Sequence, residues 1–229
     1  MDTGVGGRHG ILASSRNELK SLGLTHFQYQ DGDHIGLVFA LASLIPIFLV
    51  VVETTIVLSR RELAGVLLLV GQLANEGSNL VLKTIIQQER PNMHLGDGYG
   101  MPSSHSQFMT FFIAYTVVYL EAHTAANAIH KRAVQIGAVG LGLLVMASRV
   151  YLGYHTVLQV LAGGLIGICS GCFWLWFVNR AIYNNKAVDI VLDWPICKWL
   201  LLRDSRAVPD IALAEYRLSR YATKKSKTK

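Results

Sequence analysis

Long apolar blocks recur along this chain and restrict the class of fold that it can adopt. A transmembrane helix needs about 20 predominantly apolar residues, and several stretches approach that length between short polar connections. Apolar residues make up 52% of the chain and charged residues 16%, whereas soluble domains carry about a quarter charged residues. We therefore predict an all-α, polytopic membrane bundle of about five transmembrane helices. The predicted spans are residues 35–58, 63–82, 107–120, 133–147 and 157–178.

These spans divide the chain into three regions. Residues 1–34 are polar, and we expect a partly flexible segment without a removable signal peptide, because no basic start followed by a short apolar stretch is present. Residues 35–180 form the predicted transmembrane domain. Residues 181–229 mix charges with tryptophans and short apolar runs. This mixture favours an interfacial segment, with residues 190–203 either on the membrane surface or re-entrant, followed by a basic tail.

Basic residues orient the predicted bundle in the membrane. With five spans, the connections 83–106 and 148–156 share one side with the N-terminus, and the C-terminus lies on the other. The turns on that second side and the tail carry most of the basic residues outside the polar connections. The positive-inside rule therefore predicts a cytoplasmic C-terminus and lumenal or exterior connections. The net charge of +6 is explained by topology and anionic headgroups, so no nucleic-acid partner is expected.

One predicted span carries a polar face. Its polar residues recur at intervals of three and four, which places them on one side of a helix. They are Gln72, Asn75, Glu76, Asn79 and Lys83. A polar face in a membrane helix contacts protein or water rather than lipid. Two interpretations stay open: hydrogen bonding between helices, or a path to a site at the Lys83 end.

The first polar segment holds two permanent cations, Lys83 and Arg90, with Pro91 directly after them. Seven residues correspond to about two helical turns. Lysine offers a point charge, and arginine offers a planar fork that suits phosphate oxygens. Such a pair by itself is more typical of interfacial anchoring.

The second polar segment, residues 102–105, stands where an apolar run begins. Pro102 and Ser103 favour the start of a helix, where free backbone N–H groups attract anions. His105 follows directly and changes its protonation near neutral pH. A histidine at a helix start is, taken alone, more often structural.

The third polar segment combines Arg149 with His155 and Gln159. Gly153 predicts a bend in the chain before the histidine. His155 and Gln159 are four residues apart, so one helix face can hold both, with the amide near the ring. A structural role for this histidine alone is also the simpler interpretation.

Together the three segments indicate a phosphoryl-transfer site. Three cations and a helix start can stabilise the charge of a phosphoryl group. One histidine can attack phosphorus while the other protonates the leaving oxygen. No carboxylate cluster indicates a metal, so neither a metal nor another cofactor is expected. Cys169 and Cys172 lie in an apolar span and are interpreted as small apolar residues rather than ligands.

The order and spacing of the three segments resemble the type-2 phosphatidic acid phosphatase superfamily, whose pattern is K-x6-RP, PSGH and SR-x5-H-x3-D. The resemblance covers about residues 83–159 and implies a metal-independent catalytic domain within residues 35–180. It implies that His155 is the nucleophile, through a phosphohistidine, and that His105 is the general acid. The groups that it implies for phosphate binding are Lys83, Arg90, Arg149, Ser103 and Ser104.

Two residues depart from that pattern. Ser104 replaces a glycine, and Gln159 replaces the aspartate that orients the nucleophile. A glutamine oxygen can still accept the histidine N–H, but it carries no negative charge. The same departures resemble the eukaryotic branch of the superfamily that hydrolyses dolichyl diphosphate in the lumen of the endoplasmic reticulum. That resemblance implies dolichyl diphosphate and membrane lipid as partners and a role in recycling the carrier of protein N-glycosylation.

Independent of this resemblance, the last five residues fit a dilysine K-x-K-x-x pattern that retrieves membrane proteins to the endoplasmic reticulum. Two other functions stay open from the residues. One is a lipid phosphatase of broader specificity, acting on phosphatidate or another isoprenyl diphosphate. The other is an inactive lipid-binding scaffold, for which the absence of an aspartate at Gln159 is the main argument.

Overall fold

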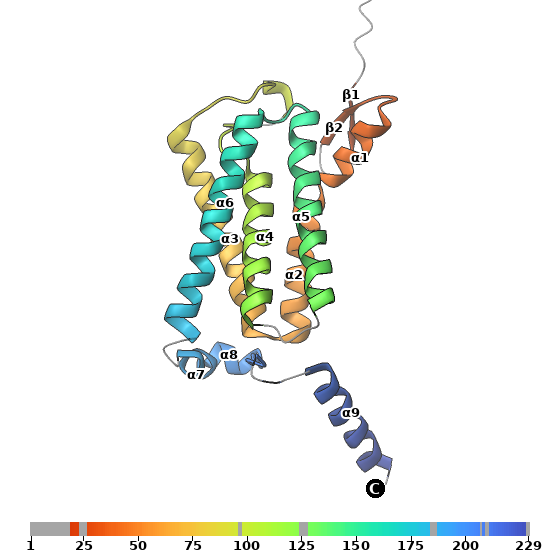
Figure 1. The fold of residues 1–229 in the computed structure, drawn as a ribbon, viewed down its shortest axis with the longest axis vertical. Helices are drawn as coiled ribbons and strands as arrows, with labels where there is room; N and C mark the ends of the chain where they lie inside the picture. The colour runs from red at the N-terminus through yellow and green to blue at the C-terminus, as the bar shows by residue number, and fades with distance from the viewer. Residues whose placement is uncertain are drawn as a thin grey trace, which may run out of the picture.

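The computed structural model of the chain describes residues 19–22, 27–95, 98–123, 128–183, 187–206, 208 and 211–227. Its body is a bundle of long helices, with a β-hairpin at one end and short helices at the other (Figure 1). The prediction of a helical bundle is confirmed. The long helices are α2 (Ile45–Arg60), α3 (Leu63–Ile86), α4 (Ser104–His123), α5 (Ala128–Tyr151) and α6 (Val157–Val178).

Within the described residues, three helical stretches are long and apolar enough to cross a membrane: His34–Arg60, Ala128–Tyr151 and Val157–Tyr183. The helices α3 and α4 have 24 and 20 residues and stand among these stretches in the bundle (Figure 1). Polar residues buried between α3 and α4 lower their mean hydropathy. The chain is therefore a membrane protein with about five helices in the bundle.

The first predicted span is broken rather than continuous. Helix α1 (His34–Ala42) ends before Ser43, and α2 begins at Ile45. Pro46 lies in the first turn of α2 and has no N–H, so the Ala42 carbonyl cannot make the usual helical hydrogen bond. At the break, the Leu44 N–H instead donates to the Leu41 carbonyl at 3.0 Å. The predicted span over residues 35–58 is nevertheless confirmed as part of the apolar stretch His34–Arg60, and its interruption at Pro46 is the expected effect of that residue.

A β-hairpin precedes α1 and was not predicted. Strand β1 (Leu19–Leu22) pairs antiparallel with β2 (Phe27–Gln30). The hairpin lies at the same end of the bundle as the α3–α4 and α5–α6 connections (Figure 1). The Gln28 N–H donates to the Tyr154 hydroxyl at 3.0 Å. The N-terminal region is thus folded against that end at least from residue 27, while residues 1–18 lie outside the described part.

Helices α4 and α6 pack with their backbones close together. Glycines replace side chains along one face of α6, at Gly163, Gly167 and Gly171. A Cβ atom at any of the three would press on the α4-side backbone, at Ser103, Gln107 and Phe111 respectively. Small residues allow such close approach in membrane helices. This packing brings the start of α4 against the first turn of α6.

The other end of the bundle carries α7 (Ala187–Leu192), α8 (Pro195–Trp199) and α9 (Ile211–Lys227) (Figure 1). Around α8, large apolar side chains are exposed, with Trp199 78% accessible. Arg203 Nε donates to Glu62 Oε1 at 2.8 Å, which joins this segment to the α2–α3 turn. The exposed tryptophans suit the predicted interfacial segment. Helix α9 was not predicted, and it includes the first residues of the expected basic tail.

Candidate active site

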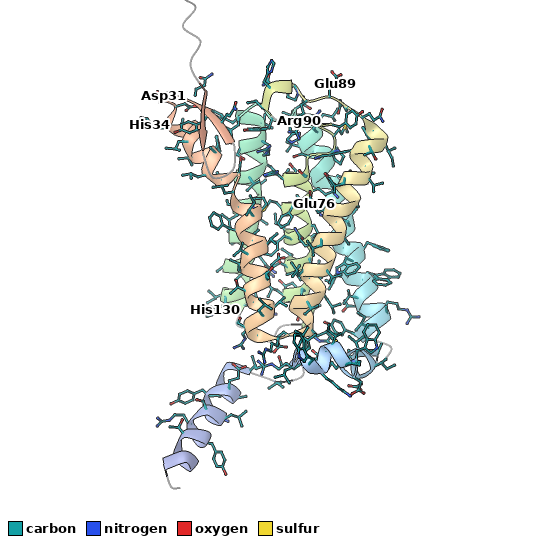
Figure 2. The ribbon with its side chains drawn as sticks, turned by 180° about the vertical axis from the view of Figure 1, so that it is seen from behind. Asp31, His34, Glu76, Glu89, Arg90 and His130 are labelled. Atoms are coloured by element: carbon teal, nitrogen blue, oxygen red, sulfur yellow. The ribbon has the colours of Figure 1, made fainter. Side chains whose placement is uncertain are left out.

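The three polar segments meet at the hairpin end of the bundle. Figure 2 shows Glu89 and Arg90 at that end, above Glu76 on α3. The second segment opens α4, and the third lies in the connection between α5 and α6. The prediction that the two connections share one side is confirmed. The structure therefore brings the ends of four helices and two connections together around His105 and His155.

A turn before α6 positions His155. Gly153 has φ +74°, a conformation that glycine adopts without strain. The N–H groups of Tyr154 and His155 both donate to the Arg149 carbonyl at 3.1 Å. Thr156 then caps α6 by accepting from the Gln159 N–H. His155 thus precedes the helix, and the expectation that it shares a helix face with Gln159 was wrong in that detail.

The side chain of Gln159 fixes the ring of His155. Its Oε1 lies 3.2 Å from His155 Nδ1 and also 3.2 Å from the Thr156 backbone N–H. The Thr156 N–H can only donate, so this amide atom is the oxygen and acts as an acceptor. His155 Nδ1 must then carry the proton that it donates. The other ring nitrogen, Nε2, keeps its lone pair.

Gln159 also connects all three segments. Its Nε2 donates to the Glu89 carbonyl at 2.8 Å, next to Arg90. Its own backbone carbonyl accepts from the Ser103 N–H at 3.1 Å. A carboxylate of the same length could not donate to the Glu89 carbonyl. The amide therefore has a structural use that the aspartate of the family pattern would lack.

His155 is held in its neutral form. Burial lowers the pKa of the imidazole to about 3, and the positive charges of Arg149, Arg90 and Lys83 contribute in the same direction. Only the hydrogen bond that the ring donates to Gln159 Oε1 opposes this shift. At neutral pH, Nε2 is therefore unprotonated and available for attack on an electrophile.

His105 stands in the first turn of α4. Its Nε2 lies 3.2 Å from the backbone carbonyl of Ser43. A carbonyl can only accept, so Nε2 carries a proton and Nδ1 is the nitrogen available for proton transfer. Ser103, directly before α4, is fully buried and accepts from the Ser106 hydroxyl at 3.2 Å. Ser104 is half-buried beside the ring.

Arg149 is almost completely buried at the end of α5. Its guanidinium stacks on the Tyr154 ring, 4.1 Å from the ring centre. Its Nη1 donates to the Ser43 hydroxyl at 3.4 Å. Sequence reasoning missed both contacts. The sequence offered one signal for Ser43: it is a polar residue inside an apolar block, three positions before Pro46.

The cations of the first segment lie on different structures. Lys83 is half-buried in the last turn of α3, which ends at Ile86. The chain reverses at Gln87, with φ 51°, so the predicted two helical turns between Lys83 and Arg90 do not form. Arg90 Nε donates to the Gly98 carbonyl at 3.3 Å. The positive charge of Arg90 nevertheless contributes to the lowered pKa of His155.

The polar face of α3 makes hydrogen bonds between helices. Gln72 donates to the Phe108 carbonyl at 3.0 Å, and Asn79 donates to Gln107 Oε1 at 2.8 Å. Gln107 in turn donates to Asn75 Oδ1 at 3.0 Å. Of the two open interpretations, interhelical bonding thus describes these three residues. The bonds hold the start of α4, and with it His105, against α3.

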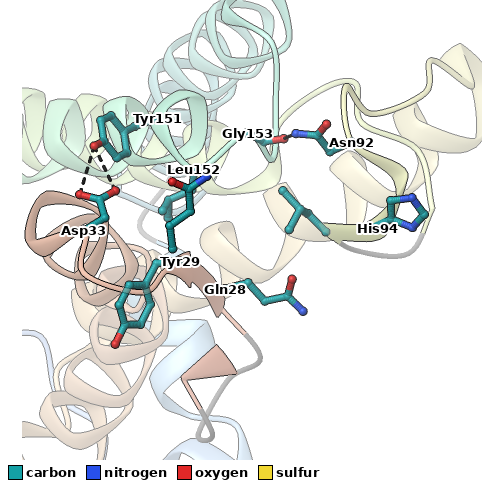
Figure 3. A pocket seen from close by; sticks show the side chains of 10 residues that line it. Gln28, Tyr29, Asp33, Asn92, His94, Tyr151, Leu152 and Gly153 are labelled. Carbon is teal, nitrogen blue, oxygen red and sulfur yellow. Dashed lines mark hydrogen bonds between the residues drawn. The ribbon is translucent and has the colours of Figure 1, made fainter. Parts of the chain in front are cut away.

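Two cavities border the site. An apolar groove of about 240 Å³ runs from His105 and Ser104 past Pro46, Val50 and Leu73, between α2, α3 and α4. A polar cavity of about 470 Å³ lies between the hairpin, the residues around His94 and the end of α5 (Figure 3). Tyr151 donates to Asp33 across its wall at 3.1 Å.

The side chains at the centre suit an anion. Among the described residues, no group of three or more His, Cys, Asp or Glu could hold a metal ion. Cys169 and Cys172 are exposed and unpaired by disulfide. The site instead combines guanidinium and ammonium groups with an oriented, neutral imidazole. Such a set can bind a phosphoryl group and attack it.

A cationic site with an oriented histidine at one end of a membrane helical bundle is typical of a membrane phosphatase, and the family comparison agrees with this class of enzyme. The family model of the PAP2 superfamily matches residues 64–183, which include all three polar segments. The chain belongs to the PAP2 superfamily. Dolichyldiphosphatase 1 of Homo sapiens is 36% identical over 208 residues, covering 86% of this chain and 87% of that protein.

Two further proteins broaden the comparison. Lipid phosphate phosphatase gamma of Arabidopsis thaliana is 34% identical over 222 residues, covering 90% of this chain and 94% of that protein. The crystal structure of a transmembrane PAP2-type phosphatidylglycerolphosphate phosphatase from Bacillus subtilis superposes with a TM-score of 0.56 at 26% identity. The superposition covers 64% of this chain and 78% of the Bacillus subtilis chain.

Proposed function

We propose that this protein hydrolyses dolichyl diphosphate to dolichyl phosphate and orthophosphate. The observation that carries the proposal is the neutral His155, oriented by Gln159 and surrounded by the charges of Arg149, Arg90 and Lys83. The relatives named dolichyldiphosphatase support this choice of substrate. The relative named lipid phosphate phosphatase supports a second candidate, a broader lipid phosphatase.

The reaction proceeds in two steps. His155 Nε2 attacks the terminal phosphorus, and the bond from phosphorus to the bridging oxygen breaks. His105 enters the reaction doubly protonated: Nε2–H stays on the Ser43 carbonyl, and Nδ1 gives its proton to the departing dolichyl phosphate. Water then attacks the phosphohistidine, with His105 taking its proton back, and orthophosphate leaves. Both histidines return to their starting protonation states.

The cations stabilise the transferred group. The forks of Arg149 and Arg90 and the ammonium of Lys83 bind its equatorial oxygens as their charge rises. The backbone N–H groups of Ser104 and His105 open α4 and add donors for the same oxygens. Ser103, whose hydroxyl accepts from Ser106, supports this turn.

The apolar groove suits the lipid chain. It is lined by Pro46, Val50, Leu73 and Phe108 and reaches His105 at one end. A polyprenyl chain in the bilayer can enter it while the diphosphate stays among the cations. Its polar lining residues are Gln72, Glu76, Ser104 and His105, and the other lining side chains are apolar.

The proposed location is the membrane of the endoplasmic reticulum, with the site facing the lumen and the C-terminus in the cytoplasm. The basic residues of the tail and turns support this orientation. The K-x-K-x-x ending supports retrieval to the endoplasmic reticulum, although its last residues lie outside the described part. There the reaction recycles the lipid carrier released after protein N-glycosylation.

The test compares orthophosphate release from dolichyl diphosphate and from phosphatidate by the purified protein in EDTA. We expect preference for dolichyl diphosphate and full activity in EDTA. Preference for phosphatidate would favour the broader phosphatase, and loss of activity in EDTA would refute the metal-independent mechanism.

A second experiment addresses the nucleophile. We expect His155→Ala to abolish turnover and to leave no acid-labile phosphoprotein after rapid quenching with labelled substrate. Turnover like that of the unchanged protein would exclude His155 as the nucleophile. An unchanged protein without turnover on any lipid phosphate would support an inactive scaffold.

A further inference from the structure

The break between α1 and α2 carries a residue that the three polar segments do not include. Ser43 lies at the break and is fully buried. It precedes residues 64–183, the part matched by the family model. It nevertheless contacts groups from the second and third segments, 62 and 106 positions away in the sequence.

The hydroxyl of Ser43 faces the end of α5. It donates to the Phe39 carbonyl at 3.1 Å, which leaves its lone pairs for other donors. Arg149 Nη1 lies 3.4 Å from this oxygen, and the Ser148 hydroxyl lies 3.0 Å from it. Ser43 therefore contacts one edge of the guanidinium.

Arg149 is restrained in two directions by these neighbours. The Tyr154 ring covers one face of the guanidinium, and Ser43 binds its edge. A planar fork held by a face and an edge cannot rotate freely, so its remaining N–H groups point in fixed directions. The Arg149 side chain is almost completely buried, so each of these contacts is stronger than it would be at the protein surface.

The backbone of Ser43 serves the other histidine. Its carbonyl accepts from His105 Nε2 at 3.2 Å. The side chain and the backbone of one residue thus reach the cation that binds phosphate and the histidine that donates a proton. The break in the first span makes this possible, because α1 and α2 separate at this point.

We propose that Ser43 is a positioning residue of the active site, which orients Arg149 through its hydroxyl and His105 through its carbonyl. This inference rests on the phosphate-binding role proposed for Arg149. The first span is then part of the catalytic apparatus and not only an anchor. Its contribution is to aim groups that belong to the other segments.

The experiment measures kcat, KM and the inhibition constant of orthovanadate for Ser43→Ala. The variant loses the hydroxyl and keeps the carbonyl. Removing a hydrogen bond to a charged group predicts a rise of about tenfold in KM and in the vanadate constant, with a smaller change in kcat. A purely structural role would instead lower the amount of active enzyme and leave KM unchanged.

Two variants complete the test. Ser170→Ala is the matched control, since this hydroxyl in α6 binds Asn75 and the Gly167 carbonyl and touches neither Arg149 nor the two histidines. We expect unchanged KM there. Ser43→Cys keeps nearly the same shape and offers a poor acceptor, so it gives the same KM rise should Ser43→Ala fail to fold.

A double-mutant cycle with Arg149→Lys identifies the route of the effect. Vanadate binding is followed by thermal shift, which needs no turnover. We expect Ser43→Ala to weaken binding in the unchanged protein and to add little in the Arg149→Lys background. Unchanged KM in both Ser43 variants, or fully additive losses in the cycle, would overturn this inference. Unchanged vanadate binding in Arg149→Lys alone would instead overturn the phosphate-binding role of Arg149.

Discussion

Replacing Gln159 with alanine tests whether orientation of the nucleophile is what this residue supplies. The amide makes four hydrogen bonds. Its Oε1 accepts from His155 Nδ1 and from the Thr156 N–H at 3.2 Å each, and its Nε2 donates to the Glu89 carbonyl at 2.8 Å and to Gln88 Oε1 at 3.4 Å. Each net hydrogen bond contributes about 1 kcal/mol. The position is fully buried, so alanine also leaves a small cavity beside the ring.

The expected result is an impaired enzyme that still turns over. The ring loses the acceptor that fixes its tautomer, and a misplacement of about 1 Å in a reacting group costs about 100-fold in rate. The charges of Arg149, Arg90 and Lys83 remain, so catalysis does not vanish. The assay is orthophosphate release at saturating dolichyl diphosphate, with thermal unfolding measured in parallel.

A buried glutamine at the other end of the bundle provides the control. Gln135 in α5 donates to Glu121 at 3.0 Å and lies far along its helix from Arg149. Gln135→Ala removes an equivalent amide, and we expect unchanged kcat. Full activity of Gln159→Ala would refute the reasoning, because another group would then orient His155. Complete loss would show that the amide takes part in the chemistry itself.

Three further outcomes follow from the structure. The lowered pKa of His155, about 3, keeps the nucleophile neutral as the pH falls. We therefore expect kcat/KM to show no loss from protonation of His155 above about pH 5, once substrate ionisation has been measured separately by phosphorus NMR. An acid limb near pH 6.5 that is abolished by substituting the residues around His155 would contradict this. Leu73→Trp should obstruct the apolar groove and raise KM for dolichyl diphosphate about threefold or more. The KM of this variant for a short-chain diphosphate should be unchanged, and so should the KM of the control Leu80→Trp for dolichyl diphosphate. Gly167→Ala should destabilise the protein by about 1–3 kcal/mol in thermal unfolding, whereas Gly137→Ala, whose added Cβ meets open space, should not.

Local sequence patterns predicted much of this fold. The bounds of α6 agree with the predicted span 157–178, because an apolar run determines such an element directly. Helix α4 begins at Ser104, where Pro102 and Ser103 predicted a helix start. The three segments were predicted to share one side because successive spans alternate across a membrane. The contact of His155 with Gln159 was predicted from their spacing, although His155 lies before α6 and not on a helix face shared with Gln159.

Other features depend on contacts between distant positions. Ser43 meets Ser148 and Arg149 only after α1, α2 and α5 have packed, so no local pattern indicates its role. The hairpin depends similarly on its docking at Tyr154. The second use of Gln159, donating to Glu89, requires the turn at Gln87 that sequence spacing did not predict.

The glycine face of α6 limits how this enzyme can move during turnover. A slide of one turn in one direction would place Leu175 against the α4 backbone near Phe111, and a slide in the other would place Gln159 against the region of Ser103. Both side chains are too large for a contact that now admits only hydrogen. The two helices that carry His105 and orient His155 therefore keep one register throughout the cycle. We therefore expect substrate entry and product release to involve other elements than a slide of α6 along α4, with the proposed nucleophile and the proposed acid at a constant separation.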